Sequence, residues 1–243
     1  MAETTNTLSD AEIQGRQLAQ QLCEASMENA TNTGVLKIRN AKGMTTTVPV
    51  KFETIVTKTN WLNIYEISNS TYKSGKFFKL MVTHIGVSNE YLASFPMVNA
   101  DVSWGTLNCY TQIVTIPIQS DAKTMVPFAN SDFWLCDLGL EFFHWPAQKV
   151  LKKEVKRSRG CTVLESTNPD PATNGYSRVV SWIDGESGGI VQAQAYDANN
   201  KLLKEFYPKD FKKVKGQWQV ERLDIDNVQT GSHTRLEFDL KAP

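Results

Sequence analysis

Ser177–Asp184 (SRVVSWID) and Ile190–Asp197 (IVQAQAYD) are apolar-rich runs of strand length that open a C-terminal series of such runs. The sequence GESGG at positions 185–189 separates them and suits a tight turn. The last run, His233–Leu240 (HTRLEFDL), alternates largely apolar residues with polar ones. A period of two places these two sets on opposite faces of a strand. Residues 176–240 therefore predict an antiparallel meander that curves over an apolar interior.

The N-terminal half repeats this pattern of short strands joined by turns rich in Asn, Gly, Ser and Lys. The expected strands are Gly34–Arg39, Thr45–Thr57, Leu62–Ile67 and Phe77–His84. Connections this short leave no room for crossover helices, so the sheet should be antiparallel. Residues 85–128 are less regular: Ile113–Ile118 and Met125–Phe128 resemble strands, and Tyr91–Pro96 is interpreted as a short helix. Val150–Val155 and Cys161–Ser166 are predicted strands that lead into the meander.

Two helices are expected over this sheet. Ser9 and Glu12 form a capping box, which predicts a helix over residues 9–27. Trp134, Leu138 and Phe142 recur every four residues in the second candidate, residues 130–147. Either helix could pack as an ordinary cover or act as a lid over a cavity.

The chain shows no internal repeat and no linker, so we expect a single domain over residues 1–243. Residues 1–8 should be flexible, residues 34–128 should form the first part of the sheet, and residues 150–240 should form the C-terminal meander. The predicted fold class is mainly β (α+β).

Composition excludes some classes of function. The 26 Lys and Arg residues balance the 26 Asp and Glu residues, which argues against nucleic-acid binding, since that depends on an excess of cation. The basic cluster Lys149–Arg159 is interpreted as a solvated strand face, with contact to anionic lipid or a partner as the alternative. There is no run of about twenty apolar residues and no apolar core near Met1 that would indicate a signal peptide.

No metal or cofactor site is predicted. The four cysteines contain no CxxC pair, so we interpret them as buried free thiols, with a Cys136–Cys161 disulfide as the alternative. Asp224 and Asp226 are interpreted as a solvated strand end, with a weak cation site as the alternative.

The turn around Ser187 matches the GxSxG pattern of serine hydrolases. That enzyme motif requires a strand before the serine and a helix after it, whereas a strand pattern follows here. His84, His144 and His233 also lack the sequence surroundings of a catalytic base. We therefore expect no catalytic residues, and a hydrolase using Ser187 is the least favoured function.

Several short motifs together resemble the bacterial outer-membrane lipoprotein-sorting family, the LolA/LolB-like carriers. They are Gly34–Ile38, Ser131–Phe133, Asp137-Leu138, Arg159–Glu165, Tyr176–Asp184, Tyr196-Asp197, Lys201-Leu202, Lys204 and Thr234–Leu236. The resemblance covers nearly the whole chain, and the order of the motifs carries most of its weight.

This resemblance implies an incomplete β-barrel covered by one or two helices, with a hydrophobic cavity that holds acyl chains. It also implies a periplasmic, non-enzymatic carrier of lipoproteins or other acylated ligands, with at most transient contact with a membrane. The alternative is a filled barrel that binds an envelope protein partner. The candidate lining residues are Trp61, Tyr65, Phe78, Leu80, Trp134, Leu138, Phe142, Trp182, Leu236 and Phe238. Each of them could equally be ordinary core, because a filled barrel uses the same residue types.

Overall fold

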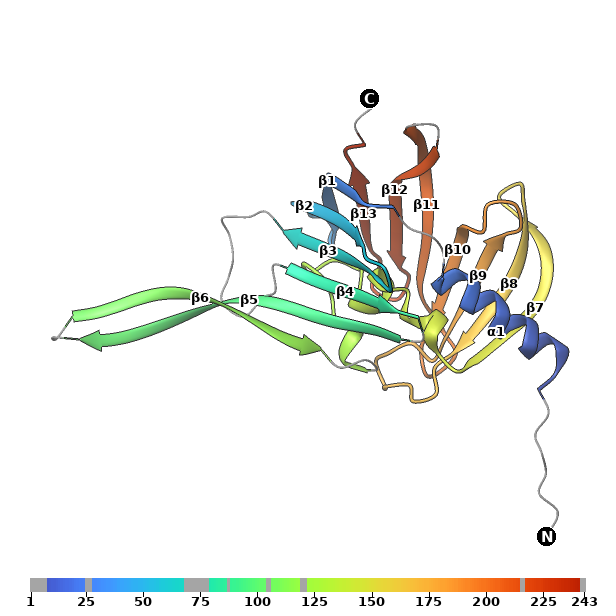
Figure 1. Ribbon diagram of the computed structural model, residues 1–243, viewed down its shortest axis with the longest axis horizontal. Coiled ribbons are helices and arrows are strands. Elements are labelled where there is room, and N and C mark those ends of the chain that lie inside the picture. The colour runs from blue at the N-terminus through green and yellow to red at the C-terminus, as the bar shows by residue number, and fades with distance from the viewer. Residues whose placement is uncertain are drawn as a thin grey trace, which may run out of the picture.

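The computed structural model describes residues 8–24, 28–67, 79–86, 88–103, 106–118, 122–214 and 217–240, except for the side chains of 98–103, 106–111, 122 and 217 (Figure 1). Thirteen strands in this part of the chain form one antiparallel sheet. They are β1 Ala30–Arg39, β2 Thr45–Val56, β3 Trp61–Ile67, β4 Lys79–Ile85, β5 Ser88–Ser103, β6 Thr106–Ile118, β7 Ala147–Lys156, β8 Arg159–Thr167, β9 Arg178–Asp184, β10 Ile190–Tyr196, β11 Leu202–Val214, β12 Gln217–Asn227 and β13 Ser232–Phe238.

The sheet consists of two meanders that meet at its centre. Its order is β6-β5-β4-β3-β2-β1-β13-β12-β11-β10-β9-β8-β7, so every neighbour except the β1–β13 pair is also next in sequence. β1 and β13 pair from Gly34↔Phe238 to Arg39↔His233. The sheet is strongly curved but does not close into a barrel, and β6 and β7 are its two edges (Figure 1). The predicted fold class is confirmed.

The predicted strands are found, most with ends shifted by a few residues and Ile113–Ile118 as the last part of the longer β6; residues 77 and 78 lie outside the described residues. Two short segments were assigned wrongly. Tyr91–Pro96 belongs to β5 and is not a helix. Met125–Phe128 makes only an isolated bridge, between Pro127 and Trp134, and is not a regular strand. Short apolar runs are ambiguous in this way, because periodicity alone cannot assign them without the neighbouring strand.

The first predicted helix is present as α1, Asp10–Cys23. Its capping box forms as expected, and the Ser9 amide donates to Glu12 Oε2 at 2.8 Å. Residues 25–27 of the expected helix lie outside the described residues. The helix packs on β7 at Gly15, Ala19 is buried against the cover segment and the strands, and Ile13 is 42% exposed.

The second predicted helix, residues 130–147, is wrong. Residues 122–146, which we call the cover segment, contain only three short turns of helix: η1 Ala122–Thr124, α2 Leu135–Leu138 and η2 Glu141–His144. Left-handed residues interrupt them, with φ of 58° at Asn130 and 50° at Leu140. A regular helix would point its side chains along one stripe, but this segment spreads its aromatic residues over the curved sheet. No helix of the described chain is long and apolar enough to cross a membrane.

Candidate binding face

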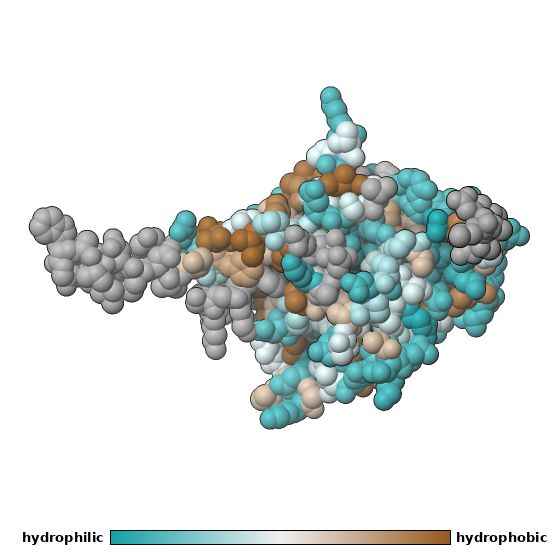
Figure 2. Space-filling model, turned by 90° about the horizontal axis from the view of Figure 1, so that it is seen from below, coloured by the Kyte–Doolittle hydropathy of each residue, from teal (hydrophilic) through white to brown (hydrophobic). Residues whose placement is uncertain are grey.

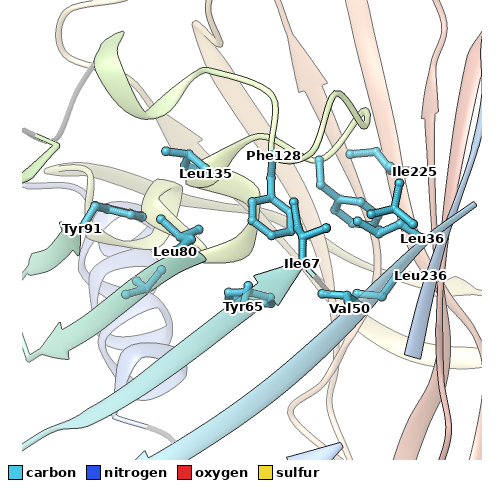
Figure 3. Packing of buried hydrophobic residues seen from close by; sticks show 13 residues of the cluster. Leu36, Val50, Tyr65, Ile67, Leu80, Tyr91, Phe128, Leu135, Ile225 and Leu236 are labelled. Carbon is cyan, nitrogen blue, oxygen red and sulfur yellow. The ribbon is translucent and has the colours of Figure 1, made fainter. Parts of the chain in front are cut away.

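The inner face of the sheet, on which the cover segment packs, is lined by apolar side chains from both meanders. Leu36, Val50, Leu80 and Leu236 come from four different strands and are each at most 4% exposed. Figure 3 shows these side chains gathered under the cover segment, together with Tyr65 and Ile225 from two further strands. Burial of this apolar surface is the main free energy that holds the cover segment on the sheet.

The cover segment inserts its own aromatic and aliphatic side chains into this lining. Phe128, Phe133 and Leu135 are each at most 1% exposed. Phe128 reaches down from the cover segment toward Tyr65 and Ile67 (Figure 3), and its ring meets that of Tyr65 edge-on at 6.0 Å. The volume between the sheet and its cover is therefore occupied by the chain itself.

A second apolar cluster lies on the inner face of the C-terminal meander, between its strands, the cover segment and α1. Phe142, Phe143 and Trp145 of the cover segment pack there against Leu164, Val179, Ile183 and Ala193 of the strands, and against Ala19 of α1. Phe142 contacts both of its aromatic neighbours edge-on, with ring centroids 4.6 and 6.4 Å away. The helix α1 thus covers part of this cluster together with the cover segment.

Polar anchors also fix the cover segment to the sheet. Asp132 is held by β13: its amide donates to Thr234 Oγ1 at 2.9 Å, and the Thr234 hydroxyl donates to Asp132 Oδ2 at 2.8 Å. Ser232 donates to the other carboxylate oxygen at 2.5 Å. Thr234 is fully buried, so these bonds form out of water, where an unmade partner is costly.

Lys204 of β11 is the second anchor, and its side chain is only 1% exposed. Its Nζ donates to the carbonyl of Asp132 at 2.7 Å, lies 3.5 Å from Asp137 Oδ2, and sits 3.5 Å above the Trp134 ring. Tyr176 donates to Asp137 Oδ1 at 2.9 Å. Burial lowers the pKa of Lys204, and the Asp137 carboxylate opposes that shift. The ammonium group is thus satisfied by a charge, a carbonyl and an aromatic face.

Glu141 is the third anchor, at the β4–β5 end of the sheet. The Tyr91 hydroxyl donates to Glu141 Oε2 at 2.6 Å, and Asn89 Nδ2 donates to the carbonyl of Gly139 at 2.7 Å. A Cβ at Gly139 would lie 2.1 Å from the Tyr91 oxygen, so only glycine allows this approach. Burial raises the pKa of Tyr91, and the neighbouring Glu141 raises it further.

Two histidines and a thiol lie near this anchor. Trp61 stacks on His84 with ring centroids 3.5 Å apart, and His84 Nε2 has no hydrogen-bond partner among the described residues. Burial lowers the pKa of His84 to about 4. Cys23 Sγ lies 3.6 Å from His144 Nε2, but burial raises the pKa of its thiol to about 12. A thiol with that pKa supplies almost no thiolate at neutral pH, so the pair is a poor nucleophile.

A small cavity lies on the inner face among Asp137, Phe142, Tyr176, Lys204 and Phe206, with a free volume of ≈ 10 Å³. That volume is about the minimum for one water molecule and far too small for an acyl chain. Side chains of the cover segment and the sheet fill the space around it.

Eight of the ten predicted lining residues lie on the inner face, one lies outside the described residues, and one lies on the outer face. Tyr65, Leu80, Leu138, Leu236 and Phe238 belong to or pack against the first inner cluster, and Trp134 and Phe142 belong to or pack against the second. Trp61 precedes Tyr65 by four residues on β3 and therefore shares its face. Phe78 lies outside the described residues. Trp182 is not brought together with the others, because it faces the opposite side of β9.

Trp182 and Cys161 lie together in a separate cluster on the outer face. Trp182 packs with Cys161, Val163 and Val180, and its indole donates to Glu154 Oε1 at 2.6 Å. Cys136 lies in the second inner cluster, so the sheet separates it from Cys161, and both are free thiols. The Cys136–Cys161 disulfide is therefore wrong for this structure.

Two further predictions concerned Ser187 and Asp224, which are also on the outer side of the sheet. Ser187 lies in the β9–β10 turn, and its hydroxyl donates to Asp184 Oδ2 at 2.6 Å. Arg159 Nη2 donates to the same oxygen at 2.6 Å and keeps the pKa of Asp184 well below the usual range. The solvated position predicted for Asp224 is wrong: its side chain is fully buried, with Arg235 Nε at 3.1 Å. No group of three or more metal-ligating side chains is found in the described chain.

The buried anchors were not identified as site residues from the sequence. A signal for Lys204 existed, because alternation along β11 places it on the same face as Phe206. A lysine at an apolar position indicates a buried partner. Nothing comparable marked Glu141 or Asp137, whose partners come from distant strands.

The likenesses to solved structures define the fold. A DUF1329 family protein from Desulfovibrio piger superposes with a TM-score of 0.70 at 18% identity, covering 95% of this chain and 92% of that one. A putative outer membrane lipoprotein-sorting protein domain from Vibrio parahaemolyticus gives 0.70 at 18%, covering 94% and 92%. A LolA superfamily protein from Nitrosomonas europaea gives 0.57 at 14%, covering 97% and 94%. The chain has the LolA-like fold, which confirms the resemblance seen in its motifs.

The family can be stated more narrowly. Residues 111–240 match the model of a family described as "Uncharacterized protein". That match spans more than half of the chain, so the chain belongs to this family. No curated protein matches it.

Proposed function

We propose that this protein is a non-enzymatic binding protein of the bacterial cell envelope that takes acylated ligands, such as lipoproteins, on its inner face. The observation that carries the proposal is how that face is closed. An apolar surface built by strands of both meanders is covered by residues 122–146, a segment with little regular structure, held at three polar anchors. The name of the Vibrio parahaemolyticus neighbour, a putative outer membrane lipoprotein-sorting protein domain, supports the ligand class and a location in the cell envelope.

An acyl chain would enter by replacing the cover segment. The cavity of ≈ 10 Å³ beneath the cover is too small to hold an acyl chain. Each methylene that moves from water onto the apolar face contributes about 0.8 kcal/mol, which must offset the loss of Phe128, Phe133 and Leu135 from the same face. The polar anchors do not resist this exchange as strongly as apolar packing would, because water can satisfy them once the segment lifts.

A second candidate follows from the same filled interior. If the cover segment never lifts, the protein is an envelope interaction protein whose surface binds another protein. A packed inner face favours this alternative, so the decisive question is whether the cover segment can be displaced.

Thr234→Val tests displacement. The substitution keeps the shape of the side chain but removes both hydrogen bonds with Asp132, at a cost of about 1–3 kcal/mol to the closed state. We expect the wild type to bind a fluorescent long-chain fatty acid, and Thr234→Val to bind it about fivefold to a hundredfold more tightly, since opening is easier.

Val163→Ala is the matched control, because Val163 is equally buried but lies on the outer face. It should reduce the free energy of unfolding without changing the affinity for the fatty acid. If wild type and Thr234→Val are both folded and neither binds the probe, the carrier proposal is wrong and the filled-interior alternative stands.

A further inference from the structure

The hairpin β5–β6 extends well beyond the body of the sheet (Figure 1). Within the described residues, Ser94 is the last residue of β5 to pair with β4. From Phe95↔Val114 to Ser103↔Thr106 the two strands of the hairpin pair with each other, and no other strand of the described chain pairs with this part of them. A two-stranded ribbon with no third strand and no helix against it is marginally stable in water. The extension therefore favours an additional strand.

The two edges of the sheet differ in whether another element covers them. At the β7 edge α1 packs so closely that a Cβ on Gly15 would lie 2.5 Å from the amide nitrogen of Lys149. At the other edge no strand pairs with the outer side of β6 in the part of the chain that the structure describes. An open edge of this kind is a template for pairing with another chain.

The composition of β6 lacks the usual protection of an open edge. Its thirteen residues, TLNCYTQIVTIPI, contain no Asp, Glu, Lys or Arg, although such residues make up 21% of the chain. Ile113 is 62% exposed, Met97 49% and Ile116 44%. Figure 2 shows hydrophobic surface where the hairpin leaves the body. Pro117 is the one blocking residue, and it lies at the end of β6 nearest the body.

We propose that β6 pairs antiparallel with β6 of a second copy of this chain, so that two hairpins form a continuous four-stranded ribbon. A strand without charge can lie beside its own copy without like-charge repulsion. A two-fold axis across the pair closes the contact, so that it does not propagate. A lipid bilayer suits the strand less well, because it would leave the N–H and C=O groups of the open edge unpaired. This dimer is independent of whether the inner face binds acyl chains.

Sedimentation velocity on the full chain tests the dimer. We expect the wild type to dimerise at concentrations up to about 0.1 mM. Ile113→Lys should shift it to monomer, because two like charges would meet across the axis; the side chain is exposed enough for the body to fold normally. Val155→Lys is the control, since Val155 is 75% exposed on the opposite edge strand β7, and it should leave the dimer intact.

Cysteine cross-linking identifies the contact itself. In a Cys109→Ser background, single cysteines are placed at Gln112, Ile113 and Val114, and the residue nearest the two-fold axis should form a disulfide-linked dimer on mild oxidation. Val155→Cys should not. A wild type that stays monomeric throughout, or a dimer that survives Ile113→Lys and yields no cross-link on β6, would overturn the proposal.

Discussion

At the scale of single residues, the buried polar groups are what distinguish this interior from a plain apolar core. Lys204 Nζ lies 3.5 Å from Asp137 Oδ2, and the two side chains are 1% and 8% exposed. Removing one member of a buried pair leaves the other charge without compensation, which costs far more than the pair contributes as a whole. The energetic role of Lys204 is therefore best measured together with Asp137.

Lys204→Met should lower the free energy of unfolding by about 3–5 kcal/mol, because the Asp137 carboxylate then lies buried without a cation. Lys204→Met combined with Asp137→Asn should cost much less than the sum of the two single substitutions. Urea unfolding of the four proteins completes this double-mutant cycle. Additive losses would show that the two side chains do not interact.

His84 predicts a dependence of stability on pH. Its pKa falls from 6.5 to about 4 on folding, because burial disfavours the charged ring. Below pH 6.5 the unfolded chain takes up a proton that the folded chain excludes, so stability falls as the pH drops from 6.5 toward 4. Between pH 7 and pH 5 the expected loss is about 2 kcal/mol.

His84→Phe should remove this part of the pH dependence. A phenyl ring can still stack on Trp61, and it has no nitrogen to leave unpaired as Nε2 is now. The measurement is the free energy of urea unfolding at both pH values, for wild type and variant. Equal slopes in the two proteins would refute the role of His84.

Asp224 lies on the polar face of β12, yet its side chain is buried and not solvated as expected. Alternation correctly placed it on the polar face of β12, opposite Arg235 on β13. That face is not open to water at this point, because Arg222, Arg235 and Lys209 lie over the carboxylate. The sequence cannot show how long cationic side chains from neighbouring strands will cover a short acidic one.

At the scale of elements, the strands could be predicted and the cover segment could not. Alternating runs such as His233–Leu240 carry their own period, and Thr234, Leu236 and Leu240 are buried as expected. The period in the cover segment does not report its structure, because the shape of the segment follows from the curved surface beneath it. Its aromatic residues at helical spacing suggested one long helix, which the left-handed backbone at Leu140 excludes.

The contact of α1 with β7 depends on one glycine. A Cβ at Gly15 would lie 2.5 Å from Lys149 N and 2.6 Å from the carbonyl carbon of Gln148, and these backbone atoms cannot move aside cheaply. Gly15→Ala should therefore destabilise the protein by about 1–2 kcal/mol, although alanine favours an isolated helix by about 1 kcal/mol.

Gly160→Ala is the control for this substitution, because no atom lies within 4 Å of its Cβ position. It should change the free energy of unfolding by no more than about 0.5 kcal/mol. Thermal or urea unfolding of both variants decides the comparison. A Gly15→Ala variant that is more stable than wild type would show that α1 does not pack tightly on β7 in solution.

At the scale of the whole molecule, the sequence motifs led to the correct fold class but not to the state of the interior. Apolar residues on the inner face, such as Tyr65, Leu80 and Leu236, were expected to line either a cavity or a core. Both arrangements use the same residues at the same period. What separates them is whether another part of the chain occupies the space, and Phe128 and Phe133 do so here.

The pairing of β1 with β13 also determines the order in which the molecule can be completed during synthesis. Gly34 meets Phe238, a partner translated about two hundred residues later, whereas the other strand pairs join neighbours in sequence. The N-terminal meander can form its local hairpins early, but β1 keeps a free side and an uncovered apolar face until the ribosome has delivered the second meander. During that interval the nascent chain presents the kind of surface that chaperones recognise, and its maturation ends when β13 joins the two halves.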